Sequence, residues 1–575
     1  MRPPIEAILP PVNRDGRAAS AAGCGWALAV SLAGLLSPQS ATAQLAPGTP
    51  PGSLVHPLEP VSACRTCHSG LTTASGESYG AHDTWAPSML ANAARDPLFL
   101  ATVTVAEQDA PGISARCYRC HSPTAFQNGH AASGMLDRAV GDLDGVHCDT
   151  CHRAVPAPRG MAGRNGALYF NDGPEGSAPP RLGPRADAAS NTRHTSAESA
   201  FVRSSELCGT CHELEHPTRN RRAPTGEDMG YLLPLQTTYS EWLQSDFGRG
   251  PSPETCQSCH MPGASSTESL RVARIGAAPN RPGVLRHDLH GANAWGMDLL
   301  RAAYPGEADA AFTAARARVE ATLRTAARVE ITEVPAEAAP GAQVTLRVRV
   351  TNLTGHKLPT GYEDARVMWI ELRVGDSVVS GAYANDELVE DPQARVYRLQ
   401  LGRMEGGGPV LNDFVASHEV VMEDTRIPPR GARPEARIAP VGRDYAGGPD
   451  GALRHYDEAA YTVRLPTSGA TVPITARLMY RSTTRHYIES IAGANRTDAR
   501  GTELLRLWDA SGRAAPLEVA RATATVRTGG SDGSDDGGCT ARPGAPRAAS
   551  TGGLLTCVAA LAAMRRRRRP QRARV

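Results

Sequence analysis

The second half of the chain alternates hydrophobic and polar residues with a period of two. Such alternation places one face of a strand in a core and the other face in solvent. Short alternating runs separated by loops rich in Pro and Gly favour an antiparallel β-sandwich over β–α–β units. We expect the strands at residues 344–350, 367–374, 395–401, 461–465 and 474–480.

Helical spacing of apolar residues occurs in two places before that half. Apolar residues recur at roughly helical intervals from Trp85 to Gln108, where Pro97 is expected to split the helix because it lacks a backbone N–H. A second helix, rich in Ala and Arg, is predicted from about Glu307 to Thr325. The rest of the first half is rich in Gly, Pro, Ser and Asn, which predicts little regular structure.

Five copies of Cys-x-x-Cys-His occupy this irregular first half. In a c-type haem, two cysteines bond the porphyrin through thioethers and the histidine after the second cysteine binds the iron. Two intervening residues let both sulfurs reach one porphyrin edge. We therefore predict five covalent haems with five iron atoms. The motifs are Cys64/Cys67/His68, Cys117/Cys120/His121, Cys148/Cys151/His152, Cys208/Cys211/His212 and Cys256/Cys259/His260.

Cysteine pairs also occur in zinc sites and redox dithiols. Here a histidine directly follows every pair, and the pairs lack the matched spacing of zinc knuckles, so haem attachment is favoured. Ten of the 13 cysteines lie in the motifs, and Cys24, Cys539 and Cys557 lie in apparent targeting segments. No cysteine is left in the core for a structural disulfide.

Composition excludes one class of partner. The net charge is +2 with 21% charged residues, so the chain lacks the basic excess typical of nucleic-acid binding. Aromatic residues make up only 5% of the chain, which is sparse for a large core. Porphyrins are one source of the missing apolar bulk, and additional Leu and Val are another.

Both ends of the chain have the composition of targeting segments. Arginines, a short apolar stretch and Ala41-Thr-Ala43 predict a signal peptide cleaved after Ala43. Near the C-terminus, Cys539 precedes an apolar stretch, and the run Arg565–Arg569 follows it. The apolar stretch has about 13 residues, fewer than the roughly 20 that span a membrane. The segment of Cys539, apolar stretch and arginine run is either a weak membrane anchor or, by resemblance, a MYXO-CTERM sorting tail. That resemblance implies processing near Cys539 and display at the outer surface.

These features together predict a multidomain α+β protein, since 575 residues are too many for one compact domain. A haem-packed domain, mainly helical or irregular, would precede an all-β sandwich domain. The predicted parts are a signal peptide (1–43), a pentahaem domain (44–300), a connecting helix (301–327), a β-sandwich (328–527), a linker (528–538) and a sorting or anchor tail (539–575).

Residues 60 to 300 resemble multihaem cytochromes of the cytochrome c554 type. The similar segments are 88–93, 145–149, 204–212 and 256–262. The resemblance implies a fold packed around haems, with two axial histidines on most irons and haems close enough for electron hopping. It also implies His82, His194 and His287 as distal iron ligands, with His290 as the substitute for His287. His130, His147 and His216 are weaker candidates.

One further histidine belongs to the second half of the chain. His356 lies in Gly355-His-Lys-Leu-Pro-Thr-Gly361, which resembles a loop that follows the haem region in related cytochromes and reaches back to a haem. We expect His356 to be a distal ligand, which would make the β domain complete the haem array. A buried loop histidine is the alternative.

Two functions are consistent with five haems. The favoured one is electron transfer in the periplasm or at the cell surface. The expected partners are redox proteins, such as a quinol oxidase-type donor or other cytochromes. The C-terminal tail is expected to hold the protein at the cell envelope membrane. The other is catalysis at one five-coordinate haem on a small nitrogen or sulfur compound such as nitrite or hydroxylamine. The chain has no Cys-x-x-Cys-Lys, which marks the catalytic haem in some nitrite reductases. A lesser hypothesis is that the sandwich binds a partner or surface polymer.

Overall fold

The structure, a computed structural model, describes residues 47–132, 134–161, 163–186, 193–276, 278–361 and 365–528. The predicted signal peptide, the sorting tail and all but the first residue of the linker lie outside these ranges. Within them, no helix has both the length and the apolar character needed to cross a membrane.

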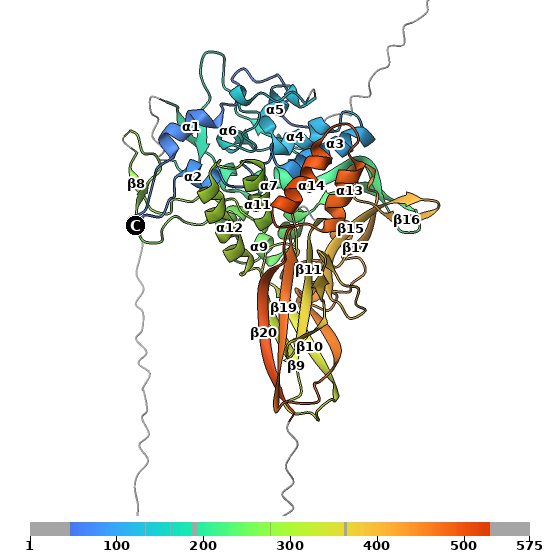
Figure 1. Ribbon diagram of the computed structural model, residues 1–575. Coiled ribbons are helices and arrows are strands. Elements are labelled where there is room, and N and C mark those ends of the chain that lie inside the picture. Colours follow the sequence, from blue (N-terminus) through green and yellow to red (C-terminus); the bar gives the residue numbers. More distant parts are fainter. Residues whose placement is uncertain are drawn as a thin grey trace, which may run out of the picture. The chain divides into compact units, whose positions relative to one another are not determined.

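Short helices dominate the region before residue 330 (Figure 1). They are α1 (Val61–His68), α2 (Ala81–Trp85), α3 (Pro97–Asp109), α4 (Ser114–His121), α5 (Pro123–Gln127), α6 (Cys148–His152), α7 (Ser205–His212), α8 (Thr238–Leu243), α9 (Asp246–Arg249), α10 (Cys256–His260), α11 (Ala294–Ala303) and α12 (Asp309–Leu323). The strands here are β1 (Ala154–Val155), β2 (Tyr169–Phe170), β3 (Arg181–Gly183), β4 (Ser196–Glu198), β5 (Leu214–Arg222), β6 (Asp228–Gln236), β7 (Leu270–Arg271) and β8 (Asn280–Arg281).

Pro97 begins a helix instead of splitting one. It occupies the first turn of α3, where its missing N–H costs nothing, and the Asp96 carboxylate accepts a hydrogen bond from the Leu98 N–H. Residues 86–96 form turns between α2 and α3. The apolar spacing across residues 85–108 therefore belongs to two helices and a loop.

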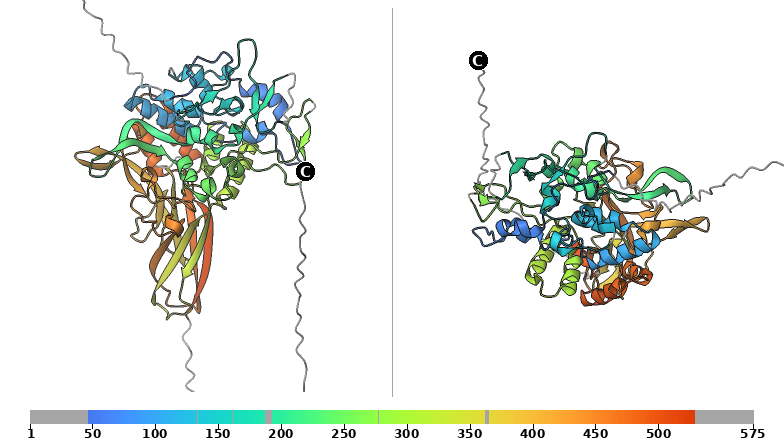
Figure 2. Two further views of the ribbon diagram at one scale, coloured as in Figure 1. Left: turned by 180° about the vertical axis from the view of Figure 1, so that it is seen from behind. Right: turned by 90° about the horizontal axis from the view of Figure 1, so that it is seen from above.

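The β-strands after residue 326 form two main sheets and the separate pair β13–β14. They are β9 (Ala327–Glu333), β10 (Gln343–Asn352), β11 (Val367–Val374), β12 (Ser377–Ser380), β13 (Tyr383–Ala384), β14 (Glu387–Leu388), β15 (Val396–Glu405), β16 (Gly408–Leu411), β17 (Val420–Asp424), β18 (Tyr456–Arg464), β19 (Thr471–Arg481) and β20 (Leu517–Arg527). One sheet has the order β18-β10-β9, and the other has the order β20-β19-β11-β15-β17-β5-β6 (Figures 1 and 2).

The two sheets enclose the largest hydrophobic core. Alternate residues of β10, including the fully buried Leu346 and Val348, meet alternate residues of β11 and β19, such as Ile370 and Leu478. The pairing is antiparallel, with Leu346 opposite Tyr461 in β18 and Ile370 opposite Leu478. The predicted period-two pattern thus produces a sandwich at the predicted strands.

The larger sheet extends beyond the second half of the chain. The hairpin β5–β6, which directly follows the fourth haem motif, joins its edge through a parallel pairing of Arg222 with Val420 in β17. The hairpin and the strands after residue 326 therefore share backbone hydrogen bonds, and the Arg222 N–H donates to the Glu419 carbonyl at 2.7 Å.

The prediction that the second half is all β was wrong. Two helices, α13 (Arg485–Ala494) and α14 (Arg500–Ala510), stand between β19 and β20. Their buried residues recur at helical spacing, as in Ile488 and Ile491, and they pack with Trp295 of α11 and Val105 of α3. Ten-residue amphipathic helices give a weaker sequence signal than the long strands around them.

The helices α13 and α14 yield a stability prediction. Leu504 is fully buried in their shared core, while its neighbour Leu505 is 39% exposed. Leu504→Ala should therefore lower the free energy of unfolding by about 2–5 kcal/mol, because a cavity remains in the core. Urea denaturation followed by far-ultraviolet circular dichroism measures the effect. Leu505→Ala is the matched control, and an equal loss in both variants would show that α14 is not packed as described.

Candidate functional site

Each of the five haem motifs ends a short helix. The helices α1, α4, α6, α7 and α10 all terminate at the motif histidine. On a helix, residues three and four positions apart lie on one face, so both cysteines and the histidine of a motif point to the same side. None of the ten motif cysteines is engaged in a disulfide. The local geometry therefore suits attachment of one haem to each motif.

Every motif histidine is oriented by a hydrogen-bonding partner at Nδ1. Carbonyl oxygens lie beside this nitrogen in four of them, and the side-chain amide of Gln236 lies 3.1 Å from the fifth, in His212. The carbonyl partners are Val272 for His68 (2.8 Å), Ala93 for His121 (3.4 Å), Leu182 for His152 (2.7 Å) and His290 for His260 (2.8 Å). An anchored Nδ1 fixes the ring and leaves Nε2 for a metal. None of these partners was predicted from the sequence, because each comes from a distant segment.

Two predicted distal ligands lie opposite motif histidines. The ring centroids of His152 and His287 are 6.3 Å apart, and those of His260 and His356 are 6.4 Å apart. An iron between two imidazoles, with bonds of about 2 Å on each side, requires about 6.3 Å between ring centres. Both spacings match this value, so these residues fit a haem iron held by two histidines.

The charge state of these two distal candidates also suits a metal. Burial lowers the pKa of His287 and the pKa of His356 to about 4. Both imidazoles are therefore neutral at pH 7, and the neutral ring is the form that binds iron.

The other two predicted distal ligands lie near the first motif. Burial lowers the pKa of His68, and His194 and His152 add to this effect. His82 contacts Asp83 (3.7 Å between Nδ1 and Oδ1) and Trp85 on its own helix. Among the described residues, no motif histidine faces His82 at the spacing of the two pairs above. The roles of His82 and His194 stay predictions.

The weaker candidates are engaged with protein groups. His130 Nδ1 bonds Asp142, His147 Nε2 bonds Thr124, and His290 Nε2 lies 2.8 Å from the Thr322 hydroxyl. His216 uses both nitrogens: Nε2 bonds the Ala416 carbonyl, and Nδ1 accepts from the N–H groups of Thr218 and Arg219. The protein thus supplies hydrogen-bond partners for all four rings.

The five motifs are packed against one another. Thiols from different motifs lie near one another and shift each other's pKa, namely Cys64 with Cys148, Cys120 with Cys211, and Cys208 with Cys256. Cys151 of the third motif is close enough to Cys208 and Cys211 to raise the pKa of each thiol, although burial and the thiol partners act more strongly. The contacts therefore run from the first motif to the third and from the third to the fourth. The fourth also meets the second and the fifth.

A buried ion network holds the His356 loop. Lys357 Nζ lies 2.5 Å from Asp424, and Arg426 binds both oxygens of the same carboxylate at 2.7 and 2.8 Å. Arg426 also pairs with Glu241 of α8 at 3.1 Å, and Glu241 accepts the Lys357 N–H. All four side chains are no more than 5% exposed. The network therefore ties the loop that carries His356 to α8 in the haem region and to β17 in the sandwich.

Asn352 closes the loop at its other end. Its side-chain amide donates to the carbonyls of His356 (2.8 Å) and Ile427 (2.9 Å), and its oxygen accepts from the Thr354 N–H and hydroxyl. The position of His356 is thus set by side chains from both halves of the chain, which is why the sequence motif alone did not identify its partner histidine.

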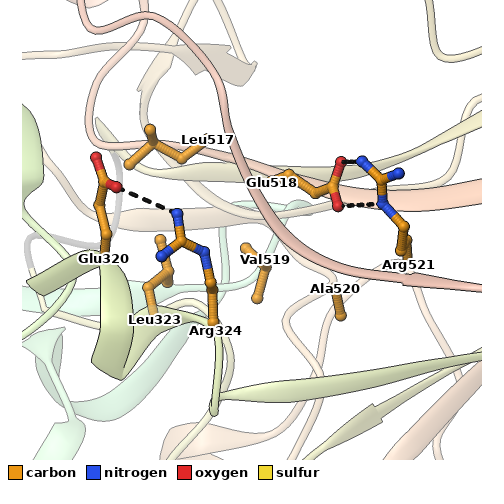
Figure 3. Close-up of a pocket in the computed structure, with 8 residues that line it drawn as sticks. All are labelled: Glu320, Leu323, Arg324, Leu517, Glu518, Val519, Ala520 and Arg521. Atoms are coloured by element: carbon orange, nitrogen blue, oxygen red, sulfur yellow. Dashed lines mark hydrogen bonds and ion pairs between the residues drawn. The ribbon is translucent and has the colours of Figure 1, made fainter. Parts of the chain in front are cut away.

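One pocket of the described region is separate from the motifs. It has a volume of about 470 Å³ and lies between α12 and β20 (Figure 3). Its charges are already paired, Glu320 with Arg324 and Glu518 with Arg521, and its eight lining residues include no histidine or cysteine. This pocket does not offer the ligands of a haem.

Comparison with known proteins finds a family similar to the segment that contains the first three motifs. Residues 63–153 match the family cytochrome c554 and c-prime. The matched segment contains the first three motifs, from Cys64 to His152. The match supports a multihaem c-type cytochrome with covalently bound haem c and its iron as the cofactor, in accord with the resemblance seen in the sequence. No curated protein matches the chain.

A solved structure is also similar to this chain. It is a penta-heme cytochrome c552 from Thermochromatium tepidum, with a TM-score of 0.44 and 17% sequence identity. The similarity covers 82% of this chain and 100% of that chain.

The ion network predicts a specific pH dependence of stability. Burial alone would raise the pKa of Asp424, but Arg426 and Lys357 hold it at about 2. Because this pKa lies below its unfolded value of about 3.9, the stabilisation is present above pH 4 and is lost as the pH falls toward 2. Asp424→Asn should reduce the free energy of unfolding at pH 7 by about 3–5 kcal/mol. The difference between wild type and variant should shrink below pH 4.

Urea denaturation from pH 2 to pH 7 measures this difference. Glu405→Gln is the matched control, because Glu405 pairs with Arg403 but is 57% exposed, and exposed pairs contribute about 0–1 kcal/mol. A constant difference between wild type and Asp424→Asn across the pH range would contradict the role of the Asp424 charge.

Proposed function

We propose that this protein is an exported c-type cytochrome that binds five haems covalently and transfers electrons in the periplasm or at the cell surface. The observation that carries the proposal is that all five motif helices present an anchored histidine and pack against one another. Electron transfer between haems needs only close cofactors held rigidly, and the motif contacts form one connected set. The C-terminal tail would hold the protein at the cell envelope.

Coordination by two histidines is proposed for at least two haems. The pairs His152–His287 and His260–His356 have the spacing of a six-coordinate iron. His194 is proposed as the partner of His68, and His82 stays a candidate beside the first motif. Six-coordinate haems have no open position for substrate, which supports the role of a carrier.

Catalysis at one haem is the second candidate function. The Phe99 ring stacks on His121 at 3.8 Å between centroids, with an angle of 4° between the planes. Among the residues that the structure describes, no histidine ring faces His121 or His212 at the spacing of the other pairs. This favours an open position at the second or the fourth motif, where nitrite or hydroxylamine would bind.

Haem number is tested by mass spectrometry of the mature protein. Five additions of about 616 Da each are expected above the mass of the cleaved chain, since each motif supplies two thioether bonds. Cys256→Ser/Cys259→Ser should lose one addition. Four or fewer additions in the wild type would contradict the proposal of five haems.

Axial ligation is tested by electron paramagnetic resonance of the oxidised protein. His356→Ala should convert one haem from low spin to high spin and shift its reduction potential, because the iron loses its sixth ligand. His290→Ala is the matched control, since its side chain bonds Thr322 while only its backbone meets His260. An unchanged spectrum in His356→Ala would remove the proposed ligand. A high-spin signal in the wild type that changes with nitrite would favour the catalytic alternative.

A further inference from the structure

The first motif lies at an exposed part of the described region. None of the residues of α1 is buried. The hairpin formed by β7 and β8 covers the end of this helix, because the Val272 carbonyl contacts His68 and the Arg274 N–H donates to the Cys67 carbonyl at 2.8 Å. In Figure 1 the label β8 marks this hairpin beside α1 and α2.

The same hairpin carries exposed apolar side chains. Val272 is 38% exposed, Ile275 is 53% exposed, and Leu285, just after β8, is 38% exposed. Single exposed apolar residues are ordinary, but three on one short hairpin form a cluster of the kind that partner proteins cover.

Arginines without acidic partners surround this cluster. Arg271 donates to the Gly276 carbonyl, Arg274 to the Thr66 carbonyl and Arg185 to the Pro282 carbonyl. Arg65 is exposed on α1. Within the part of the chain that the structure describes, no ion pair neutralises these four guanidinium groups.

Three carboxylates lie near the hairpin, and one of them is paired with an arginine. Glu77 pairs with Arg286, whereas Glu268 accepts a hydrogen bond from the Ala74 N–H and Asp83 accepts one from the Gly70 N–H, so both keep their charge. Many other surface arginines of the protein do have carboxylate partners, for example Arg506 with Glu503. The surface beside the first motif thus carries exposed apolar side chains and a net positive charge, because the four arginines outnumber the carboxylates of Asp83 and Glu268.

We propose that this surface docks an acidic redox protein that exchanges electrons with the haem of the first motif. We call it the first-motif patch and define it as Arg65, Arg271, Val272, Arg274 and Ile275. An apolar centre with arginines around it is the composition of a protein interface. Complementary charge speeds the encounter of weakly bound electron-transfer partners. The proposal rests on the proposed function.

The transfer itself is a one-electron step. Cys64, Cys67 and His68 would hold this haem, which would accept one electron from the reduced cofactor of the partner or return one electron to its oxidised cofactor. The thiol contacts between the first and third motifs then connect the patch to the other motifs. Electrons would enter or leave the set of haems at the first-motif patch.

The test uses the full haem-loaded protein and a flavodoxin as the acidic probe. Binding is measured by isothermal titration calorimetry at low and high ionic strength. Reduction of the haems by flavodoxin hydroquinone is measured by stopped flow. Arg271→Glu/Arg274→Glu should weaken binding about tenfold or more at low salt and slow the reduction similarly, because two attractive charges become repulsive. High salt should reduce the difference between variant and wild type.

The matched control is Arg464→Glu/Arg496→Glu, which changes the net charge equally at exposed residues of β18 and after α13. Unchanged absorption spectra and five haem additions in every variant show that loading is intact. Arg271→Gln/Arg274→Gln should give an intermediate loss, which separates the charge effect from misfolding.

Three outcomes would overturn the proposal. The first is equal weakening in the patch and control variants, and the second is no salt-dependent binding of flavodoxin to the wild type. The third is that the patch variants bind flavodoxin as the wild type does but lose another interaction. That interaction would be binding to vesicles containing phosphatidylserine, or self-association measured by sedimentation. A wild type that carries no haem would instead overturn the proposed function.

Discussion

An iron with two axial histidines requires two imidazole rings from unrelated parts of the chain to face each other about 6.3 Å apart. A motif supplies one ring by its local helix, because the two cysteines and the histidine share one helical face. The second ring must be delivered by folding. In this protein the ring of His287, in the segment before α11, lies 6.3 Å from that of His152, and the ring of His356, in the loop after β10, lies 6.4 Å from that of His260. Both distances meet this requirement.

The loop that carries His356 is held by charges buried at the junction of the two halves. Removing Lys357, Asp424, Arg426 and Glu241 from water is costly, and a buried ion pair often contributes little net stability compared with well-packed apolar residues. Such a network does fix geometry, because each group has a partner at a defined distance and direction. A loop that must place one imidazole within a few tenths of an ångström benefits from that directionality. Apolar packing alone is less selective.

The sandwich is therefore more than an appended domain. Its larger sheet takes up the β5–β6 hairpin that follows the fourth motif, and its helices α13 and α14 pack on α3 and α11. The haem region has few long elements of its own, and its hydrophobic clusters are small. A rigid scaffold beside it, together with the haems that it would hold, supplies the order that its short helices lack.

The sequence by itself determined what depends on neighbouring residues. Cys-x-x-Cys-His places three functional groups on one helical turn, and period-two alternation specifies the strands β10, β11 and β19, because both are local patterns. The tertiary structure decided what depends on distant residues: the position of His356 beside His260, the backbone carbonyl or side-chain amide that orients each motif histidine, and the order in which the motifs meet. The two helices between β19 and β20 and the start of α3 at Pro97 were likewise decided by packing and capping. Contacts between positions far apart in the chain leave no periodic signal in a single sequence, so only the folded protein shows them.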